Sequence, residues 1–384
     1  MKIVFIEWES FGKEDVKEAF RAEGHEMVSF PVSIEEDLDD APVLENRLSL
    51  VLRRETPDIV FSINYFPAIS NVCNRECIRY ISWIYDAPYA RLYSQTVLNP
   101  CNQVYVFDKE TCMEFRNAGV DTVHYLPLAV NTDRMDAVTA SAGALELRYE
   151  VSFVGSFYVE KNDYFDQMAS GVSDFTRGYL DAVIAAQMKI QGYDFVESVL
   201  GPIINDLYKA FPLDPAPKGM ESREYLYAQY VIDRRITALE RIDLLNAIAK
   251  RHPVDIFTYI KDFTMPNVSN HGRVDYFHEM PLVFKQSRIN LNISRRGIKS
   301  GIPLRAFDIM GCGGFLLSNF QADFLDDFVP GEDFVYYESR EDLLQKVDYY
   351  LCHEEERKAI ARNGHDKVAA GHTYRHRVRE MLAV

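Results

Sequence analysis

The chain has 384 residues, of which 47% are hydrophobic and 26% are charged, and its formal net charge is −16. This length exceeds what one ordinary hydrophobic core holds, so two domains are expected. The acidic balance argues against a nucleic-acid-binding protein, whose binding face is normally basic, and against general attraction to anionic lipid.

The first 125 residues alternate between short apolar strands and amphipathic helices. Strands are predicted at Lys2–Ile6, Glu26–Phe30, Asp58–Ser62, Tyr80–Ile84, Gln103–Phe107 and Thr122–Tyr125. Helices are predicted at Lys13–Glu23, Leu44–Glu55, Ile69–Arg79 and Lys109–Ala118. This alternation is typical of an α/β domain with a parallel sheet, whose ligands lie at the carboxyl ends of the strands. We therefore predict a Rossmann-like domain over residues 1–132.

Small and polar residues replace the apolar periodicity after this series, which predicts an interdomain linker at 133–148. A second α/β series then predicts another Rossmann-like domain over 149–368, with a helical insertion at 164–250. A C-terminal helix over 369–384 is expected to pack back on the N-terminal domain. The strands of the second domain are expected at Tyr149–Gly155, Val254–Tyr259, Ile289–Ile293, Phe315–Ser318 and Asp333–Tyr337.

The most informative segment is 295–319, which follows an apolar run at Ser287–Ser294. It supplies three cations, a Ser-Gly turn and a helix beginning near Pro303, where proline has no N–H to leave unpaired. Cations that lead into a helix N-terminus form an anion site, because the free N–H groups and the helix dipole both favour negative charge. The segment therefore predicts a phosphorylated ligand, in particular a nucleotide. The alternative is that these cations are solvated loop residues.

The six cysteines show no C-x-x-C spacing, which disfavours a zinc or redox motif. The N-terminal apolar run is too short for a signal peptide. No run reaches the roughly 20 apolar residues of a membrane span. The simplest expectation is a protein of the reducing cytoplasm, without an integral membrane segment.

Several motifs carry a family resemblance. The segment Gly301–Gly314 resembles the group 1 glycosyltransferase motif, usually written with Glu-Ala-Met-Ala-Cys-Gly. The tail segments Glu332–Leu343 and Arg357–Gly364 resemble the same domain. Four upstream segments are similar to the spore-maturation CgeB-like branch: Tyr80–Tyr89, Val106–Lys109, His124–Asn131 and Ser152–Ser156. The resemblance covers most of the chain except the helical insertion.

This resemblance implies the GT-B fold, with two doubly wound Rossmann-like domains facing a cleft. The N-terminal domain would bind the acceptor and the C-terminal domain the nucleotide-sugar. The implied activity moves a sugar from a UDP-sugar to a glycan, protein or small-molecule acceptor, with no metal or other cofactor. We find no Asp-x-Asp pair in a donor loop. Two alternatives share the fold: a nucleotide-sugar 2-epimerase and a non-catalytic nucleotide-sugar binding protein.

The resemblance places Asp308 where the family holds a carboxylate on the donor ribose; the alternative is a carboxylate that interacts with the helix dipole. Many retaining relatives carry a glutamate eight residues earlier, where this chain has Ser300. This departure leaves the anomeric outcome open. Tyr276 would stack on or cap the base, or else would pack in the core.

Other residues complete the predicted donor site. A glycine after a strand permits close approach of a ligand, or makes a tight turn. Arginine binds phosphate through two parallel hydrogen bonds and lysine acts as a point charge. Arg305, inside the helix, could instead pair with a structural acid. The remaining residues of the predicted donor site are Gly155, Ser156, Arg295, Lys299, Gly301, Ile302 and Arg305.

In the N-terminal domain, Asp86 and Glu9 follow predicted strands and are candidates for the general base that activates an acceptor hydroxyl. Loop carboxylates are also commonly structural. Asn64, Tyr65 and Gly12 are the candidate residues on the acceptor side.

Overall fold

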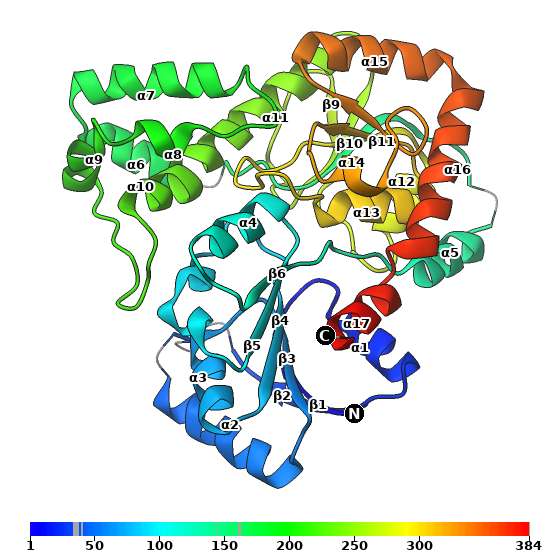
Figure 1. The fold of residues 1–384 in the computed structure, drawn as a ribbon. Helices are drawn as coiled ribbons and strands as arrows, with labels where there is room; N and C mark the ends of the chain where they lie inside the picture. The colour runs from blue at the N-terminus through cyan, green and yellow to red at the C-terminus, as the bar shows by residue number, and fades with distance from the viewer. Residues whose placement is uncertain (34–37, 40, 144, 160–162, 384) are drawn as a thin grey trace. The chain divides into compact units, whose positions relative to one another are not determined.

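The chain forms two α/β units, each built on a six-stranded parallel sheet (Figure 1). The computed structural model describes residues 1–33, 38–39, 41–143, 145–159 and 163–383. The first unit comprises Met1–Ala129, Pro215–Ser222 and His372–Val384. The second unit comprises Val130–Asp214 and Arg223–Gly371.

The sheet of the first unit has the strand order β2-β1-β3-β4-β5-β6. Its strands are apolar because helices cover both faces, as is usual for parallel sheets. In the register of the sheet, Ile3 pairs with both Met27 and Ile59. The strands are β1 Lys2–Glu7, β2 Glu26–Pro31, β3 Ile59–Ile63, β4 Arg79–Trp83, β5 Asn102–Val106 and β6 Val123–Tyr125.

Helices α1 (Lys13–Ala22) and α17 (Tyr374–Leu382) pack together on one face of this sheet (Figure 1). Phe20 of α1 packs its ring 5.1 Å from that of Phe61 on β3. Buried side chains of α2 and α3 form the core on the other face, together with Val4 of β1. The remaining helices of this unit are α2 Pro42–Glu55, α3 Pro67–Arg75, η1 Ala90–Tyr93, η2 Gln95–Leu98 and α4 Lys109–Asn117.

The short segment Pro215–Ser222 belongs to the first unit although it lies within the sequence of the helical insertion. The backbone N–H of Gln95 donates to the carbonyl of Lys218 at 2.9 Å, and the N–H of Met220 donates to the carbonyl of Tyr93 at 2.9 Å. Backbone hydrogen bonds of this kind do not depend on side-chain identity, so the sequence carries no signal for this pairing.

The sheet of the second unit has the order β12-β11-β10-β7-β8-β9. Neighbouring strands β7 and β10 are far apart in sequence, and Val151 pairs with Ile289. The strand order reverses at this pair, and ligands of open α/β sheets bind at the carboxyl ends of such strands. The strands are β7 Tyr149–Val154, β8 Val254–Phe257, β9 Val268–Asn270, β10 Ser287–Asn292, β11 Leu316–Asn319 and β12 Val335–Tyr337.

Helices α11 and α15 contribute Leu245 and Val347 to the core on one side of this sheet. Helix α5 occupies most of the segment 133–148 that the sequence analysis assigned to a linker. It belongs to the second unit because Met135 is buried and lies beside Gly311 of α13. The helices are α5 Thr132–Ser141, α11 Asp233–Ala249, α12 Met280–Lys285, α13 Leu304–Gly311, α14 Phe324–Asp327, α15 Arg340–Cys352 and α16 Glu354–Gly371.

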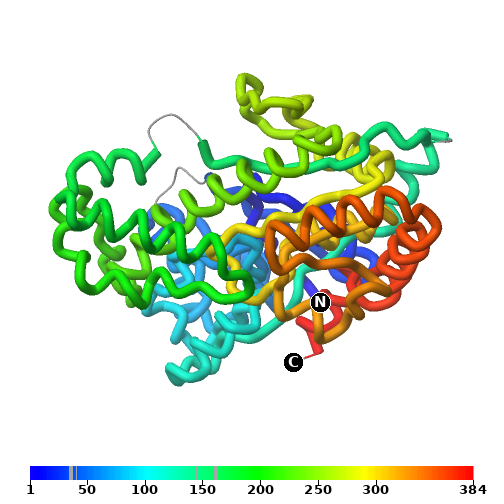
Figure 2. Tube along the Cα trace, turned by 90° about the horizontal axis from the view of Figure 1, so that it is seen from above, coloured from blue at the N-terminus to red at the C-terminus, as the bar shows by residue number. Residues whose placement is uncertain are grey.

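The helical insertion has a hydrophobic core of its own, which includes Met168, Leu180 and Ile232. Figure 2 shows its helices, in green, grouped together, with α11 continuing from them toward the sheet of the second unit. A π-helical turn, η3 Tyr227–Ile232, leads directly into α11. The other insertion helices are α6 Tyr164–Gly171, α7 Asp174–Gln187, α8 Val196–Val199, α9 Ile204–Ala210 and α10 Arg223–Leu226. None of the described helices has the length and apolar character needed to cross a bilayer.

Candidate functional site

Arg241 links the carboxyl ends of β7 and β10. This side chain on α11 is buried, and its Nε and Nη2 donate to the carbonyl of Ile293, at 3.2 and 2.6 Å. Its Nη1 donates to the carbonyl of Ser156 at 2.5 Å. A permanently charged guanidinium is therefore fixed by backbone oxygens at the point where the strand order reverses.

Arg305 lies beside Arg241, near the N-terminus of α13. Its Nη1 donates to Oδ1 of Asn292 at 3.1 Å. Burial, together with the positive charge of Arg241, lowers the pKa of Arg305 to about 10. Both effects disfavour the charged guanidinium of Arg305. A bound anion would offset both of them, because its negative charge stabilises the two neighbouring cations.

Gly155 makes room for this guanidinium. A Cβ atom on Gly155 would lie 2.7 Å from Nη2 of Arg305 and 3.1 Å from the ring of Phe153. The glycine predicted to permit close approach of a ligand thus permits the close approach of Arg305. The neighbouring Ser156 lies 3.3 Å, from Oγ to hydroxyl, from Tyr259.

Asp308 and Tyr276, which were both predicted to bind the nucleotide, are in contact with each other. The hydroxyl of Tyr276 donates to Oδ1 of Asp308 at 3.2 Å, and Asp308 is buried. The guanidinium of Arg134 lies 5.5 Å from the centre of the Tyr276 ring. The contact fixes the carboxylate one turn into α13, next to Arg305 in the same helix.

Residues 293–303, here called the donor loop, are held by backbone contacts. The amide of Gln321 donates to the carbonyl of Gly301 at 3.2 Å, and the N–H of Asp323 donates to the carbonyl of Ser300 at 3.0 Å. Ile302 is 3% exposed, so its side chain packs in the core.

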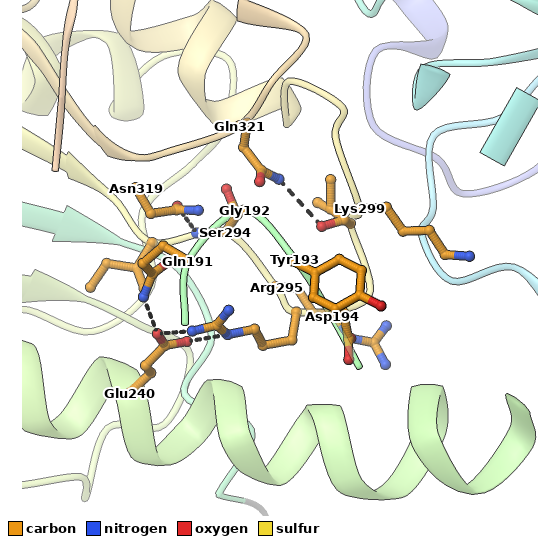
Figure 3. Close-up of a pocket in the computed structure, with 13 residues that line it drawn as sticks. Gln191, Gly192, Tyr193, Asp194, Glu240, Ser294, Arg295, Lys299, Asn319 and Gln321 are labelled. Atoms are coloured by element: carbon orange, nitrogen blue, oxygen red, sulfur yellow. Dashed lines mark hydrogen bonds and ion pairs between the residues drawn. The ribbon is translucent and has the colours of Figure 1, made fainter. Parts of the chain in front are cut away.

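Arg295 and Lys299 line a pocket together with insertion residues 191–194 (Figure 3). Nη2 of Arg295 donates to the carbonyl of Gln229 at 2.9 Å. Figure 3 shows Glu240 at one end of the pocket, with Lys299 extending away at the other. Two of the predicted phosphate-binding cations therefore border one hollow.

Arg296 has a different role from its neighbours. Its Nε donates to Oε2 of Glu240 at 2.8 Å, its Nη2 pairs with Oε1 of the same carboxylate, and its Nη1 donates to the carbonyl of Ile190. Both side chains are buried. It is thus Arg296, rather than Arg305, that pairs with a structural acid and ties the donor loop to the insertion.

In the first unit, Asn64 and Asp86 meet at the carboxyl ends of β3 and β4. Nδ2 of Asn64 donates to Oδ2 of Asp86 at 2.7 Å, and Oδ1 of Asn64 accepts the backbone N–H of Tyr85 at 2.8 Å. Asn64 has φ 60°, a left-handed conformation that asparagine tolerates better than most residues. The exposed carboxylate of Asp86 is therefore oriented by an amide.

The other candidates of the first unit lie in different environments. The side chain of Glu9 is 94% exposed and pairs with Lys13. Tyr65 is fully buried and donates to Thr96, and burial raises its pKa to about 12. Its side chain thus packs in the core instead of facing an acceptor. Gly12 has φ 74°, and a Cβ there would lie 2.7 Å from the hydroxyl of Tyr374.

Among the residues that the structure describes, no three His, Cys, Asp or Glu side chains are grouped so as to hold a metal ion. Sequence reasoning missed Arg241, which lies 52 residues before Ile293 at the start of the donor loop, inside a long helix, and carries no motif of its own. The available signal was that Arg241 lies one turn before Leu244 and Leu245 on the same helix face, since arginine is rarely buried unless it is paired.

Residues 234–383 match the family model described as Glycosyl transferase-like. This match agrees, for the C-terminal part of the chain, with the glycosyltransferase resemblance of Gly301–Gly314. Comparison with curated protein sequences finds no significant match.

Solved structures with similar folds cover the whole chain. Sucrose-phosphate synthase from Thermosynechococcus elongatus is 10% identical with a TM-score of 0.53, covering 100% of this chain and 98% of that one. HepE from Anabaena, in complex with UDP and glucose, is 12% identical with a TM-score of 0.53, covering 100% and 99%. An E. coli protein described as trehalose-6-phosphate bound with UDP-2-fluoro glucose is 10% identical with a TM-score of 0.56, covering 100% and 98%. The chain therefore has the two-domain α/β fold of GT-B glycosyltransferases, which confirms the predicted fold class.

Proposed function

We propose that the protein is a glycosyltransferase that moves a sugar from a UDP-sugar to an acceptor hydroxyl. The glycosyltransferase-like match over residues 234–383 and the GT-B fold support sugar transfer. The UDP bound to HepE of Anabaena supports the choice of base. The upstream motifs Tyr80–Tyr89 and Ser152–Ser156 favour the spore-maturation CgeB-like branch within this class.

The observation that carries the proposal is the pair Arg241 and Arg305 at the carboxyl ends of β7 and β10. Neither guanidinium forms an ion pair with a carboxylate within the described parts of the chain. Taking a charge out of water is costly unless a partner compensates for it. The donor diphosphate would supply that partner, and the carboxylate of Asp308 would hold the ribose beside it.

The same cations suit the chemistry of transfer. When the bond between the sugar C1 and the β-phosphate oxygen breaks, the electron pair stays on that oxygen and UDP leaves with additional negative charge. Arg241 and Arg305 share the ring of Phe153, at 5.3 and 5.4 Å. Arg241 and Arg295 share the ring of Tyr158, at 5.1 and 5.8 Å. These guanidinium groups would therefore stabilise this charge together. We therefore propose that departure of UDP needs no metal ion.

For the acceptor, we propose that the first unit binds it and that Asp86 removes the proton of the attacking hydroxyl. Asn64 orients the Asp86 carboxylate, which is how a general base is kept in a reactive position. Glu9 is the weaker candidate because its side chain is 94% exposed and its partner is the neighbouring Lys13 on the surface.

Ser300 favours one second candidate, a protein that binds nucleotide-sugar without transferring it. A buried serine stands where many relatives have a glutamate. Such a protein would keep the diphosphate and ribose contacts and lack turnover.

The test is incubation of the protein with a panel of UDP- and GDP-sugars, followed by analysis of the products. Transfer to an added acceptor, or slow release of UDP by hydrolysis, is the expected result. Binding without any product would establish the second candidate, and a C2-isomeric sugar would identify an epimerase. Asp86→Asn should bind UDP like the wild type and lose transfer, whereas loss of UDP binding in this variant would contradict its assignment to the acceptor side.

A further inference from the structure

Tyr158 occupies an unusual position just after the carboxyl end of β7. Its φ is 54°, in the left-handed region that non-glycine residues rarely adopt. Its backbone N–H donates to Oγ of Ser156 at 3.1 Å. Strained backbone of this kind persists only where the surroundings impose it, and it accumulates at ligand sites.

Three arginines, two from α11 and one from the donor loop, lie against the ring of this side chain. The guanidinium carbons of Arg234 and Arg241, both on α11, lie 5.0 and 5.1 Å from the ring centre. That of Arg295, in the donor loop, lies 5.8 Å away. Arg305, on α13, also acts on the phenol electrostatically. An aromatic ring within about 6 Å of guanidinium groups is favourable for each of them, but the cations still repel one another.

The charge around the phenol is reflected in its acidity. Burial alone would raise the pKa of Tyr158, but the charges of Arg241, Arg295 and Arg305 outweigh burial and lower it below the usual value of 10.0. A phenol that remains protonated in such surroundings is a strong hydrogen-bond donor to an anion.

We propose that Tyr158 is a direct ligand of the donor diphosphate, and that its hydroxyl donates a hydrogen bond to a phosphate oxygen surrounded by Arg241, Arg295 and Arg305. This inference rests on the proposed function, since it assigns one more contact at the same nucleotide site. The ring would keep the guanidinium groups apart, and the hydroxyl would complete the set of donors around the diphosphate.

The test is calorimetric titration of UDP into the wild type, Tyr158→Phe and Tyr208→Phe. Phenylalanine keeps the ring and its arginine contacts and removes only the hydroxyl. Tyr208 is the matched control, because its ring also lies on an arginine, Arg223 at 3.9 Å, and its hydroxyl donates to Asp214 in the insertion. Tyr158→Phe should bind UDP about 10- to 100-fold more weakly, the loss expected for one hydrogen bond to a charged group, and Tyr208→Phe should bind normally.

A spectroscopic titration gives a second readout. The phenolate absorbance of the wild type minus that of Tyr158→Phe isolates Tyr158, and saturating UDP should raise its pKa because the bound anion disfavours the phenolate. Equal UDP affinity in the wild type and Tyr158→Phe would overturn the inference and leave the proposed function intact. Failure of the wild type to bind UDP would overturn the UDP donor itself, and the inference with it.

Discussion

Arg296, in the donor loop, and Arg305, in the first turn of α13, lie nine positions apart, and their charges are compensated differently. Arg296 has a buried carboxylate partner in Glu240. Arg305 has the amide oxygen of Asn292, and burial together with the nearby Arg241 lowers its pKa. The first arrangement serves the folded state, whereas the second leaves charge available for a ligand.

Replacement of each arginine by methionine should separate these roles. Arg305→Met should weaken UDP binding by about 1.5–3 kcal/mol, the value of a hydrogen bond to a charged group, and leave the free energy of unfolding unchanged or slightly higher. Arg296→Met should destabilise the protein by roughly 3 kcal/mol, because it leaves Glu240 buried and unpaired. Denaturant unfolding and UDP calorimetry on both variants check this. Normal UDP affinity in Arg305→Met would contradict it.

Asp308→Ala should abolish recognition of the ribose hydroxyls. The wild type is expected to prefer UDP over its 2′,3′-dideoxy analogue by about 10- to 100-fold, because the carboxylate accepts hydrogen bonds from the ribose. The variant should bind both compounds equally weakly. Tyr276→Phe is the control, since it removes the tyrosine partner of Asp308 and keeps the carboxylate. A variant at Asp308 that still prefers UDP would remove the ribose assignment.

The affinity for UDP should fall as the pH rises toward 10. Burial and Arg241 lower the pKa of Arg305 to about 10 in the free protein, and a bound anion raises it again. The complex then holds more protons than the free protein above about pH 9, so the affinity falls about twofold by pH 10 and approaches a tenfold loss per pH unit only above that. Tyr158 acts in the same direction, because its phenolate would repel the diphosphate. Calorimetry between pH 7 and 10 measures the slope, and a flat profile would contradict this account.

At the level of elements, the turn that follows β7 controls the site through one glycine. Gly155→Ala would place a Cβ 2.7 Å from Nη2 of Arg305, so the guanidinium must move. We expect UDP binding to weaken at least tenfold, with little change in thermal stability. Gly178→Ala is the control: nothing lies within 4 Å of its Cβ, and alanine in helix α7 should stabilise the protein by about 0.5–1 kcal/mol. Unchanged UDP affinity in Gly155→Ala would show that Arg305 is not the contact.

The sequence predicted most strands of both sheets because buried parallel strands are short, continuous apolar runs. It missed β9, Val268–Asn270, a three-residue strand that is only partly buried. It assigned α5 to a linker because Thr132–Ser141 has small and polar residues on most of its faces. Only Thr132 and Met135 of this helix are buried, and two residues are too few to give a periodicity.

The predicted site residues are those that are local in sequence. Charge, proline and glycine patterns pointed to residues 295–319, and the family resemblance pointed to Asp308. Arg241 and Tyr158 could not be found in this way, because their proximity to Arg305 comes from the packing of α11 against β7 and β10. The pairing of Arg296 with Glu240 likewise depends on contact between segments over 50 residues apart.

On the scale of the whole molecule, the cationic site contrasts with a net charge of −16. Because the cations of the site are confined to a few segments, hydrogen exchange with and without UDP should show protection in a small part of the chain. We expect slower exchange in residues 155–159 and in the donor loop, because a bound nucleotide orders these segments and excludes water. Protection confined to the first unit would contradict the assignment of the donor to the second.

A crystal structure of the protein with bound UDP tests the central claim most directly. The account predicts that the diphosphate lies at the carboxyl ends of β7 and β10, with phosphate oxygens within hydrogen-bond distance of the guanidinium groups of Arg241 or Arg305 and with the ribose against Asp308. A nucleotide bound elsewhere, with these two guanidinium groups and Asp308 in the same contacts as without ligand, would contradict it.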